Sequence, residues 1–321
     1  MSEVKHEVLL QAKGIYKNFE TSKKDQAVHA LTNVDLTLYR GETLALVGES
    51  GCGKSTIFRM INGLLPPKAG TISINEKPIT AREHYCGYMP QKDMLFPWRT
   101  IGENLALPLE IQRRYTKAQQ RDMIDAALAD VGLDGCRDKR PDELSGGMRQ
   151  RAAFARTMLT GSDLLLLDEP FSALDFLTRI SMQEWLLEQW QRHKKTILFI
   201  THDLGVIAQM ADDVAVMYCG QVVEMAPAKT LFTDCEFSHP YTEGLMVSIP
   251  RLDTPAGVRL ESIPGSVPHP LNLPKGCKFA PRCKYCQQRC LEEEPELVNV
   301  TEEQQVRCFY PRKEERRANL K

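Results

Sequence analysis

The sequence predicts an α/β fold built on a mixed, mainly parallel sheet, and three observations lead to this prediction. Short apolar runs that suit strands alternate with stretches of helical spacing over residues 43–217. The run at 43–47 ends in a glycine-rich turn and passes into a helical stretch, as in a βα unit. Residues 8–46 instead alternate apolar runs with turn residues, which predicts an antiparallel β region. Alternating strands and helices favour a parallel sheet covered on both faces.

The elements after the first βα unit follow in a clear order. Two stretches of helical spacing, at 117–131 and 148–159, predict a helical subdomain at about residues 92–158. Three apolar runs and one further helical stretch then complete the sheet region, in the order strand 164–167, helix 178–193, strand 196–200 and strand 214–217.

The texture of the chain changes near residue 230. Prolines concentrate between residues 240 and 281, and five of the ten cysteines lie between residues 277 and 308. We therefore predict two domains, at 1–230 and 231–321.

Composition limits the classes of function. The 321 residues carry a formal net charge of −1, so no overall charge attracts nucleic acid or anionic lipid. The apolar runs are too short to cross a bilayer, and the first residues lack the apolar core of a signal peptide. We expect a globular protein of the cytoplasm. In that reducing compartment, clustered thiols are expected to be metal ligands or packing residues and not disulfides.

The glycine-rich turn matches the phosphate-binding pattern G-x-x-x-x-G-K-[ST], with a strand before it and a helix after it. Glycines let successive backbone N–H groups converge on phosphates at the start of a helix. Lys54 is expected to reach the β- and γ-phosphates of ATP, and the Ser55 hydroxyl to ligate Mg²⁺. A chance glycine-rich turn is the alternative, and the strand and helix argue against it. The predicted ATP-binding residues are Gly48, Glu49, Ser50, Gly51, Cys52, Gly53, Lys54, Ser55 and Thr56.

A second motif resembles the signature of the ATP-binding-cassette (ABC) family. The run Leu144-Ser-Gly-Gly-Met-Arg-Gln carries this resemblance. It implies that Ser145, Gly146, Gly147 and Gln150 face ATP held by a second ABC subunit, in a head-to-tail dimer. Ser145 would also cap the helix that follows.

Further motifs follow the order of the same family. A buried strand ends in Asp168 and Glu169, which suits a carboxylate for Mg²⁺ followed by a general base for the attacking water. The resemblance implies that Gln91 meets Mg²⁺ and the attacking water, and that Asp175 communicates between the two ATP sites. It also implies that His202 contacts the γ-phosphate and that Phe19 stacks on adenine. An ordinary core or surface role is the alternative for His202 and Phe19.

The proline-rich region resembles the C-terminal extension of oligopeptide and dipeptide importers and their nickel-carrying relatives. The resemblance rests on residues 263–268 and 273–283 together with Cys290 and Cys308. It implies a [4Fe–4S] cluster on Cys277, Cys283, Cys290 and Cys308. Zn²⁺ is an alternative, although the spacing lacks the C-x-x-C pairs of zinc ribbons, and unmetallated thiols are a further alternative.

The stretches 91–101 and 168–179 resemble a different group, the ATPases of nitrate, taurine and sulfonate importers. We therefore expect an ATP-hydrolysing importer subunit that takes up peptides, with a nitrate, taurine, sulfonate or nickel importer as the alternative. A soluble ABC ATPase acting on nucleic acid or ribosomes is the rival from another class, and an export motor is a third possibility. The short basic tail at residues 311–321 does not favour the nucleic-acid class.

The expected partners and location follow from the family resemblance. They are transmembrane permease subunits, a second ABC subunit that is either the same chain or a paralogue, and indirectly an external solute-binding protein, with no nucleic acid. The expected location is the cytoplasmic face of the cell membrane.

Overall fold

The computed structural model describes residues 7–20, 27–79, 86–171, 176–234, 238–248 and 262–311. The chain forms two compact units, and each is described by itself. Unit 1 contains residues 1–9, 38–43 and 79–201, and unit 2 contains residues 10–37, 44–78 and 202–321.

Unit 1 contains three parallel strands, in the order β6 (Cys86–Met89), β7 (Leu164–Asp168) and β8 (Thr196–Ile200). Leu165 pairs with Gly87 on one side and with Ile197 on the other. Every residue of β7 and β8 is buried. A strand covered on both faces needs a continuous apolar run, which is what the sequence provides at both places.

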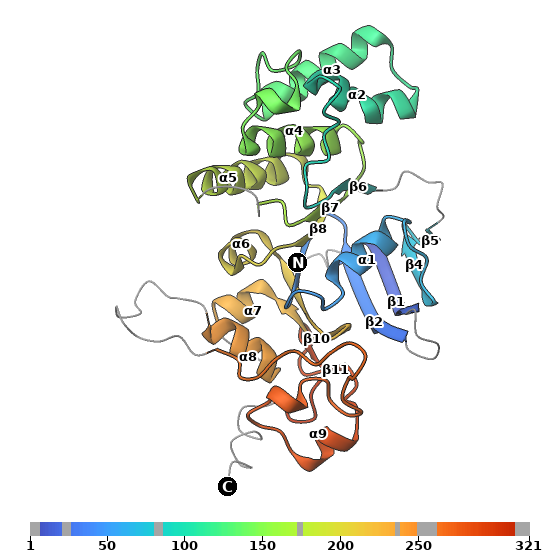
Figure 1. Cartoon of the computed structure of the whole chain (residues 1–321), viewed down its shortest axis with the longest axis vertical. Helices are drawn as coiled ribbons and strands as arrows, with labels where there is room; N and C mark the ends of the chain where they lie inside the picture. The colour runs from blue at the N-terminus through green and yellow to red at the C-terminus, as the bar shows by residue number, and fades with distance from the viewer. Residues whose placement is uncertain are drawn as a thin grey trace, which may run out of the picture. The chain divides into compact units, whose positions relative to one another are not determined.

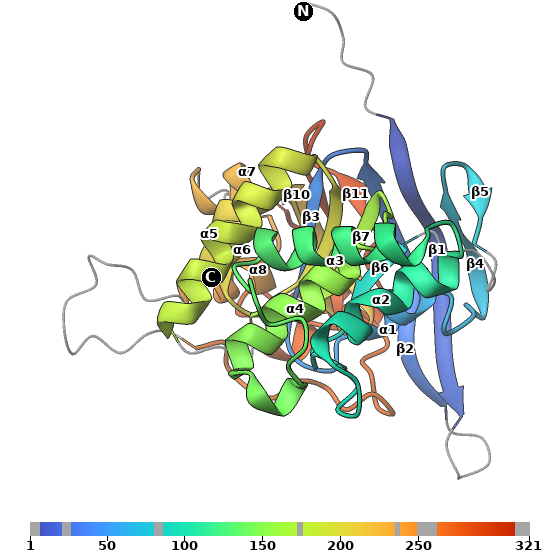
Figure 2. The same ribbon diagram turned by 90° about the horizontal axis from the view of Figure 1, so that it is seen from above.

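In unit 1 the helices α2 (Ile101–Gln112), α3 (Lys117–Asp130) and α4 (Gly146–Met158) pack on one another, as Figures 1 and 2 show in teal to green. The bounds of the helical subdomain, 92–158, stay a prediction. Thr100 and Thr116 start α2 and α3 with capping boxes completed by Glu103 and Gln119, and these bonds satisfy free N–H groups of the first turn. The short helix η1 (Pro141–Glu143) precedes α4, and α5 (Phe176–His193) follows β7.

Unit 2 contains an antiparallel sheet and a mixed group of strands. The antiparallel sheet has the order β2 (Ala27–Tyr39), β1 (Val8–Glu20), β4 (Ala69–Ile74) and β5 (Lys77–Pro78). In the second group β3 (Thr43–Val47) runs parallel to β9 (Asp213–Tyr218), and the strands beyond β9 are antiparallel. These are β10 (Gln221–Pro227), β12 (Gln305–Val306) and β11 (Val298–Asn299), in that spatial order.

The residues after 230 continue this second group of strands. Val306 of β12 pairs with Glu224 of β10, and the Arg307 side chain donates to the carbonyl of Val222. In Figure 1 this region, coloured orange to red, carries α8, α9 and β11. The boundary near residue 230 stays a prediction. The helices of unit 2 are α1 (Lys54–Ile61), α6 (Leu204–Met210), α7 (Ala228–Phe232), α8 (Pro240–Val247), η2 (Ala280–Arg282) and α9 (Gln288–Glu292).

A search of the described segments for a helix long and apolar enough to span a membrane found none.

Candidate functional site

The turn between β3 and α1 has the backbone of a phosphate-binding loop. Gly48, Gly51 and Gly53 have φ angles of 151°, 81° and 109°. A Cβ on Gly48 would lie 2.2 Å from the carbonyl oxygen of Met217, and one on Gly53 would lie 2.8 Å from the carbonyl oxygen of Ala30. The loop therefore needs glycine at Gly48 and Gly53 for both conformation and space.

Lys54 is the first residue of α1, and its side chain curls back over the loop. Its Nζ donates to the carbonyl of Gly48 at 2.6 Å and to that of Glu49 at 3.1 Å, and the residue is 6% exposed. A buried ammonium at the positive end of a helix forms an anion site. Ser55 is exposed beside it. Cys52 is buried, and burial raises the pKa of its thiol, so this cysteine faces inward as a neutral group.

In unit 1 the strand β7 delivers two carboxylates. Asp168 is its last residue and is 8% exposed. Glu169 has φ of 50°, in the left-handed region that a side chain with a Cβ avoids, and its N–H donates to the carbonyl of Ile200 at 2.9 Å. Such a conformation costs about 1–3 kcal/mol and is concentrated at functional sites.

Gln91 lies directly against Glu169. Its Nε2 donates to Oε2 of Glu169 at 2.8 Å. The contact arises because β6 and β7 are parallel neighbours whose carboxyl ends reach the same edge of the sheet. The structure thus brings together two residues that the sequence assigned to catalysis.

The signature motif forms the start of α4. Ser145 is exposed and caps the helix, with its hydroxyl accepting from the N–H of Met148 at 3.3 Å, and Gly146 and Gly147 form the first turn. Gln150, one turn further along α4, is 3% exposed, and its Nε2 donates to the carbonyl of Pro170 at 2.9 Å. Its contact with the ATP of a second subunit stays a prediction.

The remaining candidates are placed as follows. His202 is exposed, directly after unit 1 ends. Phe19 lies near the end of β1, is 39% exposed, and has Nζ of Lys17 at 5.7 Å from its ring centroid. Asp175 lies outside the described residues.

Sequence reasoning missed the groups that fasten the segment after Gln91 to α4. Nε of Arg149 donates to Oδ2 of Asp93 at 3.0 Å, and the guanidinium of Arg156 donates to the carbonyls of Asp93 and Met94. No motif spans a separation of 56 residues, so only the packing of α4 against this segment reveals the link.

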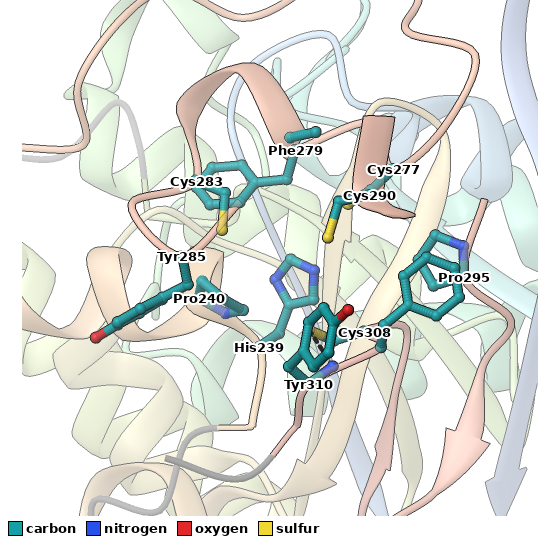
Figure 3. A pocket seen from close by; sticks show the side chains of 12 residues that line it. His239, Pro240, Cys277, Phe279, Cys283, Tyr285, Cys290, Pro295, Cys308 and Tyr310 are labelled. Atoms are coloured by element: carbon teal, nitrogen blue, oxygen red, sulfur yellow. Dashed lines mark hydrogen bonds between the residues drawn. The ribbon is translucent and has the colours of Figure 1, made fainter. Parts of the chain in front are cut away.

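Four cysteines of the region after 230 line a single pocket in unit 2. They are Cys277, Cys283, Cys290 and Cys308, and the other walls are mostly aromatic and proline side chains with His239. In Figure 3 the sulfur atoms of Cys283 and Cys290 point into the space around the His239 ring. Burial raises the pKa of Cys277 and raises that of Cys283 to about 12, so both thiols are neutral at neutral pH.

Two models of known protein families match this chain. Residues 31–172 match the family model described as ABC transporter, and residues 223–290 match the model described as oligopeptide/dipeptide transporter, C-terminal region. The oligopeptide transport ATP-binding protein AppD of Bacillus subtilis is 39% identical over 89% of this chain and 92% of its own length. The chain belongs to the ABC transporter ATPases.

Other relatives of this ABC ATPase match it along nearly their whole length. The dipeptide transport ATP-binding protein DppF of Haemophilus influenzae is 34% identical and covers 96% of this chain and 99% of its own. Among solved structures, the dimeric cassette MJ0796 in a post-hydrolysis state with ADP and Pi has a TM-score of 0.63 at 27% identity, over 68% of this chain and 99% of its own. The cassette CbiO1 of Clostridium perfringens has the same TM-score at 28% identity, over 72% and 92%.

These matches confirm the predicted α/β fold with an ABC ATPase core and the predicted enzyme class. The ABC ATPase hydrolyses ATP, and its relatives do not favour the soluble nucleic-acid or ribosome class.

Proposed function

We propose that this ABC ATPase drives the import of peptides. The observation that carries the proposal is the match to relatives named for oligopeptide and dipeptide transport over 89% and 96% of the chain, including the region after residue 223. The nitrate, taurine and sulfonate alternatives rest on two short stretches, and these relatives favour neither them nor the nickel alternative. Like its dimeric structural relative, the chain is expected to work as a pair of ABC subunits.

The ATP site is proposed to combine the phosphate-binding loop with the residues Gln91, Asp168 and Glu169. The loop of residues 48–56 cradles the phosphates, and Lys54 neutralises the β- and γ-phosphates. Phe19 stacks on adenine, His202 contacts the γ-phosphate, and Ser145 with the amides of Gly146 and Gly147 faces the ATP of the second subunit. Asp175 is proposed to communicate between the two ATP sites. Gln150 is proposed to belong to the same group as Ser145, and its amide is also bonded to the carbonyl of Pro170.

The groups proposed for Mg²⁺ are the hydroxyl of Ser55, the amide oxygen of Gln91 and the carboxylate of Asp168. They fit a hard cation because all three offer oxygen, and the bond from Nε2 of Gln91 to Glu169 leaves the amide oxygen of Gln91 for a metal. Mg²⁺ bound there supplies neutralisation of charge on the phosphates.

Glu169 is proposed as the general base. The amide of Gln91 fixes one carboxylate oxygen, and the left-handed backbone fixes the direction of the side chain. The carboxylate is thereby aimed before water arrives, which lowers the cost of orienting it in the transition state.

The permease is proposed to dock on the loop between Gln91 and α2. Phe96 and Trp98 stack with their ring centroids 5.1 Å apart, and Trp98 is 69% exposed. Asn104, fully buried, shapes this loop: its Nδ2 donates to the carbonyls of Phe96, Arg99 and Thr100, and its Oδ1 accepts from the N–H of Phe96. A rigid loop that presents an exposed tryptophan is suited to a protein partner. Docking there would hold the ATPase at the cytoplasmic face of the membrane.

The four-cysteine pocket is proposed to hold a [4Fe–4S] cluster. Four thiols in a mostly apolar pocket are the donor set that such a cluster takes. In the part of the chain that the structure describes, no three His, Cys, Asp or Glu side chains converge closely enough to hold one metal ion. Zn²⁺ is the alternative occupant, and the proposal of a cluster rests on the four thiols of the pocket alone.

The function is tested by purifying the tagged ATPase with its membrane partners and reconstituting the complex in proteoliposomes. We expect ATP-dependent uptake of labelled di- and oligopeptides in the presence of the matching solute-binding protein. Uptake of taurine, nitrate or Ni²⁺ without uptake of peptides would contradict the proposed substrate. Co-purification of ribosomes or DNA without any polytopic membrane protein would contradict the transporter assignment itself.

A further inference from the structure

A guanidinium from the cysteine-rich region lies against the phosphate-binding loop, with both partners inside unit 2. Arg282, the last residue of η2, donates from its two terminal nitrogens to the two carboxylate oxygens of Glu49, at 2.9 and 3.0 Å. The side chain of Arg282 is 5% exposed and that of Glu49 is 27% exposed. A paired, largely buried contact of this kind is strong and directional.

Arg282 makes two further hydrogen bonds. Nε donates to the carbonyl of Pro264 at 3.0 Å, and one terminal nitrogen donates to the hydroxyl of Tyr218 at 3.3 Å. The guanidinium is therefore held in one orientation. Separation from Glu49 would leave the buried guanidinium of Arg282 without a counter-charge, which costs free energy. We therefore expect the two side chains to stay in contact.

Glu49 links this contact to Lys54. Its N–H donates to the hydroxyl of Tyr241 in α8 at 3.0 Å, and its carbonyl accepts from Nζ of Lys54 at 3.1 Å. The side chain, the N–H and the carbonyl of Glu49 thus each have a different partner. Two of the three come from the region after residue 230, and the third is the lysine of the ATP site.

The other end of the link lies at the cysteine pocket. Between Cys277 and Cys283 the chain forms η2, in which the N–H of Ala280 donates to the carbonyl of Cys277 and the N–H of Cys283 donates to that of Ala280. Arg282 directly precedes Cys283. Phe279, which lines the pocket, packs on Tyr218 and Tyr241 with ring centroids 5.3 and 5.4 Å away.

We propose that Arg282 is a positioning residue that makes ATP binding depend on occupancy of the four-cysteine pocket. With Cys277 and Cys283 ligated, both ends of η2 are anchored and Arg282 holds Glu49 and, through it, the loop around Lys54. With the thiols free, η2 loses its anchors and the loop loses this support. By linkage, ATP stabilises the occupied pocket by the same factor. The inference rests on the proposed iron–sulfur cluster.

The test measures the affinity for MgATP by equilibrium titration, on anaerobically purified protein and again after the cluster is removed with an oxidant and chelator. We expect removal to weaken ATP binding roughly tenfold in the unsubstituted chain, within the usual range of such couplings. Arg282→Lys, which cannot pair with both carboxylate oxygens, should bind ATP weakly with the cluster present and lose little more when it is removed. In Glu49→Gln, which changes the other partner of the contact, ATP affinity should likewise no longer depend on the cluster.

Arg192→Lys is the control, because it makes the same change away from the pocket, at an exposed arginine that pairs with Asp130. It should keep the full dependence of ATP affinity on the cluster. The visible absorbance of the cluster should be unchanged in Arg282→Lys, which separates a coupling role from damage to the pocket. Equal effects of Arg192→Lys, or a dependence that survives in Arg282→Lys and Glu49→Gln, would refute the coupling.

The two proposals fail in distinguishable ways. A colourless, iron-free protein contradicts the cluster and, with it, this coupling. A brown protein whose ATP affinity is the same with and without the cluster overturns the coupling alone.

Discussion

At the scale of single residues, Glu169 shows how backbone and side chain combine. Its left-handed φ and its hydrogen bond from Gln91 leave the carboxylate few orientations. A residue of this kind tolerates loss of charge without loss of fold, because Gln keeps the size and the acceptor oxygen that Gln91 needs.

We predict that Glu169→Gln lowers the ATPase rate at least about 100-fold, because a positioned base contributes 10²- to 10⁴-fold. ATP binding should be retained, and the variant should accumulate as an ATP-bound dimer, visible by size-exclusion chromatography with ATP. Glu184→Gln, at an exposed position of α5, is the control and should hydrolyse ATP normally. Normal turnover in Glu169→Gln would remove Glu169 from the mechanism.

Glu224 is a buried carboxyl outside the ATP site. It is fully buried, and its oxygens accept from the N–H groups of Ser238 and His239 and from the amide of Gln304. Burial raises the pKa of Glu224 above its usual value, although the hydrogen bonds oppose this. The folded state therefore binds this proton more tightly than the unfolded state does.

It follows that the contribution of Glu224 to stability is full below its unfolded pKa of about 4.3 and is lost as the pH rises through its higher folded pKa. We predict that the free energy of unfolding, measured with urea from pH 4.5 to pH 8, falls more with rising pH in the unsubstituted chain than in Glu224→Gln. The glutamine does not titrate, so its variant lacks this slope. Parallel curves would show that the carboxyl is not protonated in the folded state.

At this scale the sequence predicts residues but not their partners. Gln91 and Glu169 follow from motif order, yet their hydrogen bond depends on β6 lying beside β7, which no local pattern contains. The motif likewise predicts Gln150 but not its hydrogen bond to the carbonyl of Pro170, which lies 20 residues further along the chain. Arg282 belongs to the stretch 273–283 that carried the family resemblance, but its contact with Glu49 is visible only in the structure.

At the scale of elements, side-chain contacts join the segment after Gln91 to the helix α4. Asp93 and Arg149 are joined by an ion pair, and Arg156 holds the same segment through carbonyl oxygens. The side chains of Asp93 and Arg149 are 29% and 35% exposed, so the pair contributes only about 0–1 kcal/mol to stability. We expect the pair instead to transmit movement from the loop between Gln91 and α2 to Ser145 at the start of α4.

We predict that Asp93→Asn leaves the basal ATPase rate within about twofold, because such a pair adds little to stability. Stimulation of ATPase activity by the permease should fall severalfold, measured in proteoliposomes. Asp125→Asn is the control, because Asp125 of α3 forms a similar ion pair with Arg137. It should keep the stimulation. Equal loss of stimulation in both variants would show a general loosening of unit 1.

The elements themselves were largely predictable. Long apolar runs and helical spacing predicted β7, β8, α3 and α4 to within a few residues, because burial forces those patterns. The strands β11 and β12 were not predicted, since two residues are too few to show a period. Their position comes from pairing with β10, a contact over some 80 residues of sequence.

At the scale of the whole molecule, the cysteine-rich region separates this chain from a minimal cassette. The solved cassettes that resemble it cover 68% and 72% of the chain, whereas the peptide-transport relatives cover 89% and 96%. The sequence predicted this region from its cysteines, and the structure places four of them around one pocket. The proposed cargo rests on relatives that cover 89% and 96% of the chain, because the stretch near Gln91 alone pointed to another group of importers.

We predict that replacing Cys277 and Cys283 together by Ser abolishes the visible absorbance and the iron content of anaerobically purified protein, because two of four thiolate ligands are lost. Replacing Cys136 and Cys86, which lie outside this pocket, should leave both unchanged. A colourless unsubstituted protein that contains stoichiometric zinc would instead establish the zinc alternative.

The pairing of β12 with β10 also affects how the chain is made. β10 ends at Pro227 and β12 begins at Gln305, so about 80 residues are synthesised before the outer edge of β10 receives its partner. At about 5–20 residues per second this interval lasts roughly 4–16 s. An unpaired strand edge invites pairing with other chains. In nascent chains of this ATPase the outer edge of β10 therefore stays unpaired for this period, and chaperones can bind it there. A product that ends before residue 305 lacks β12, so its β10 edge stays unpaired permanently.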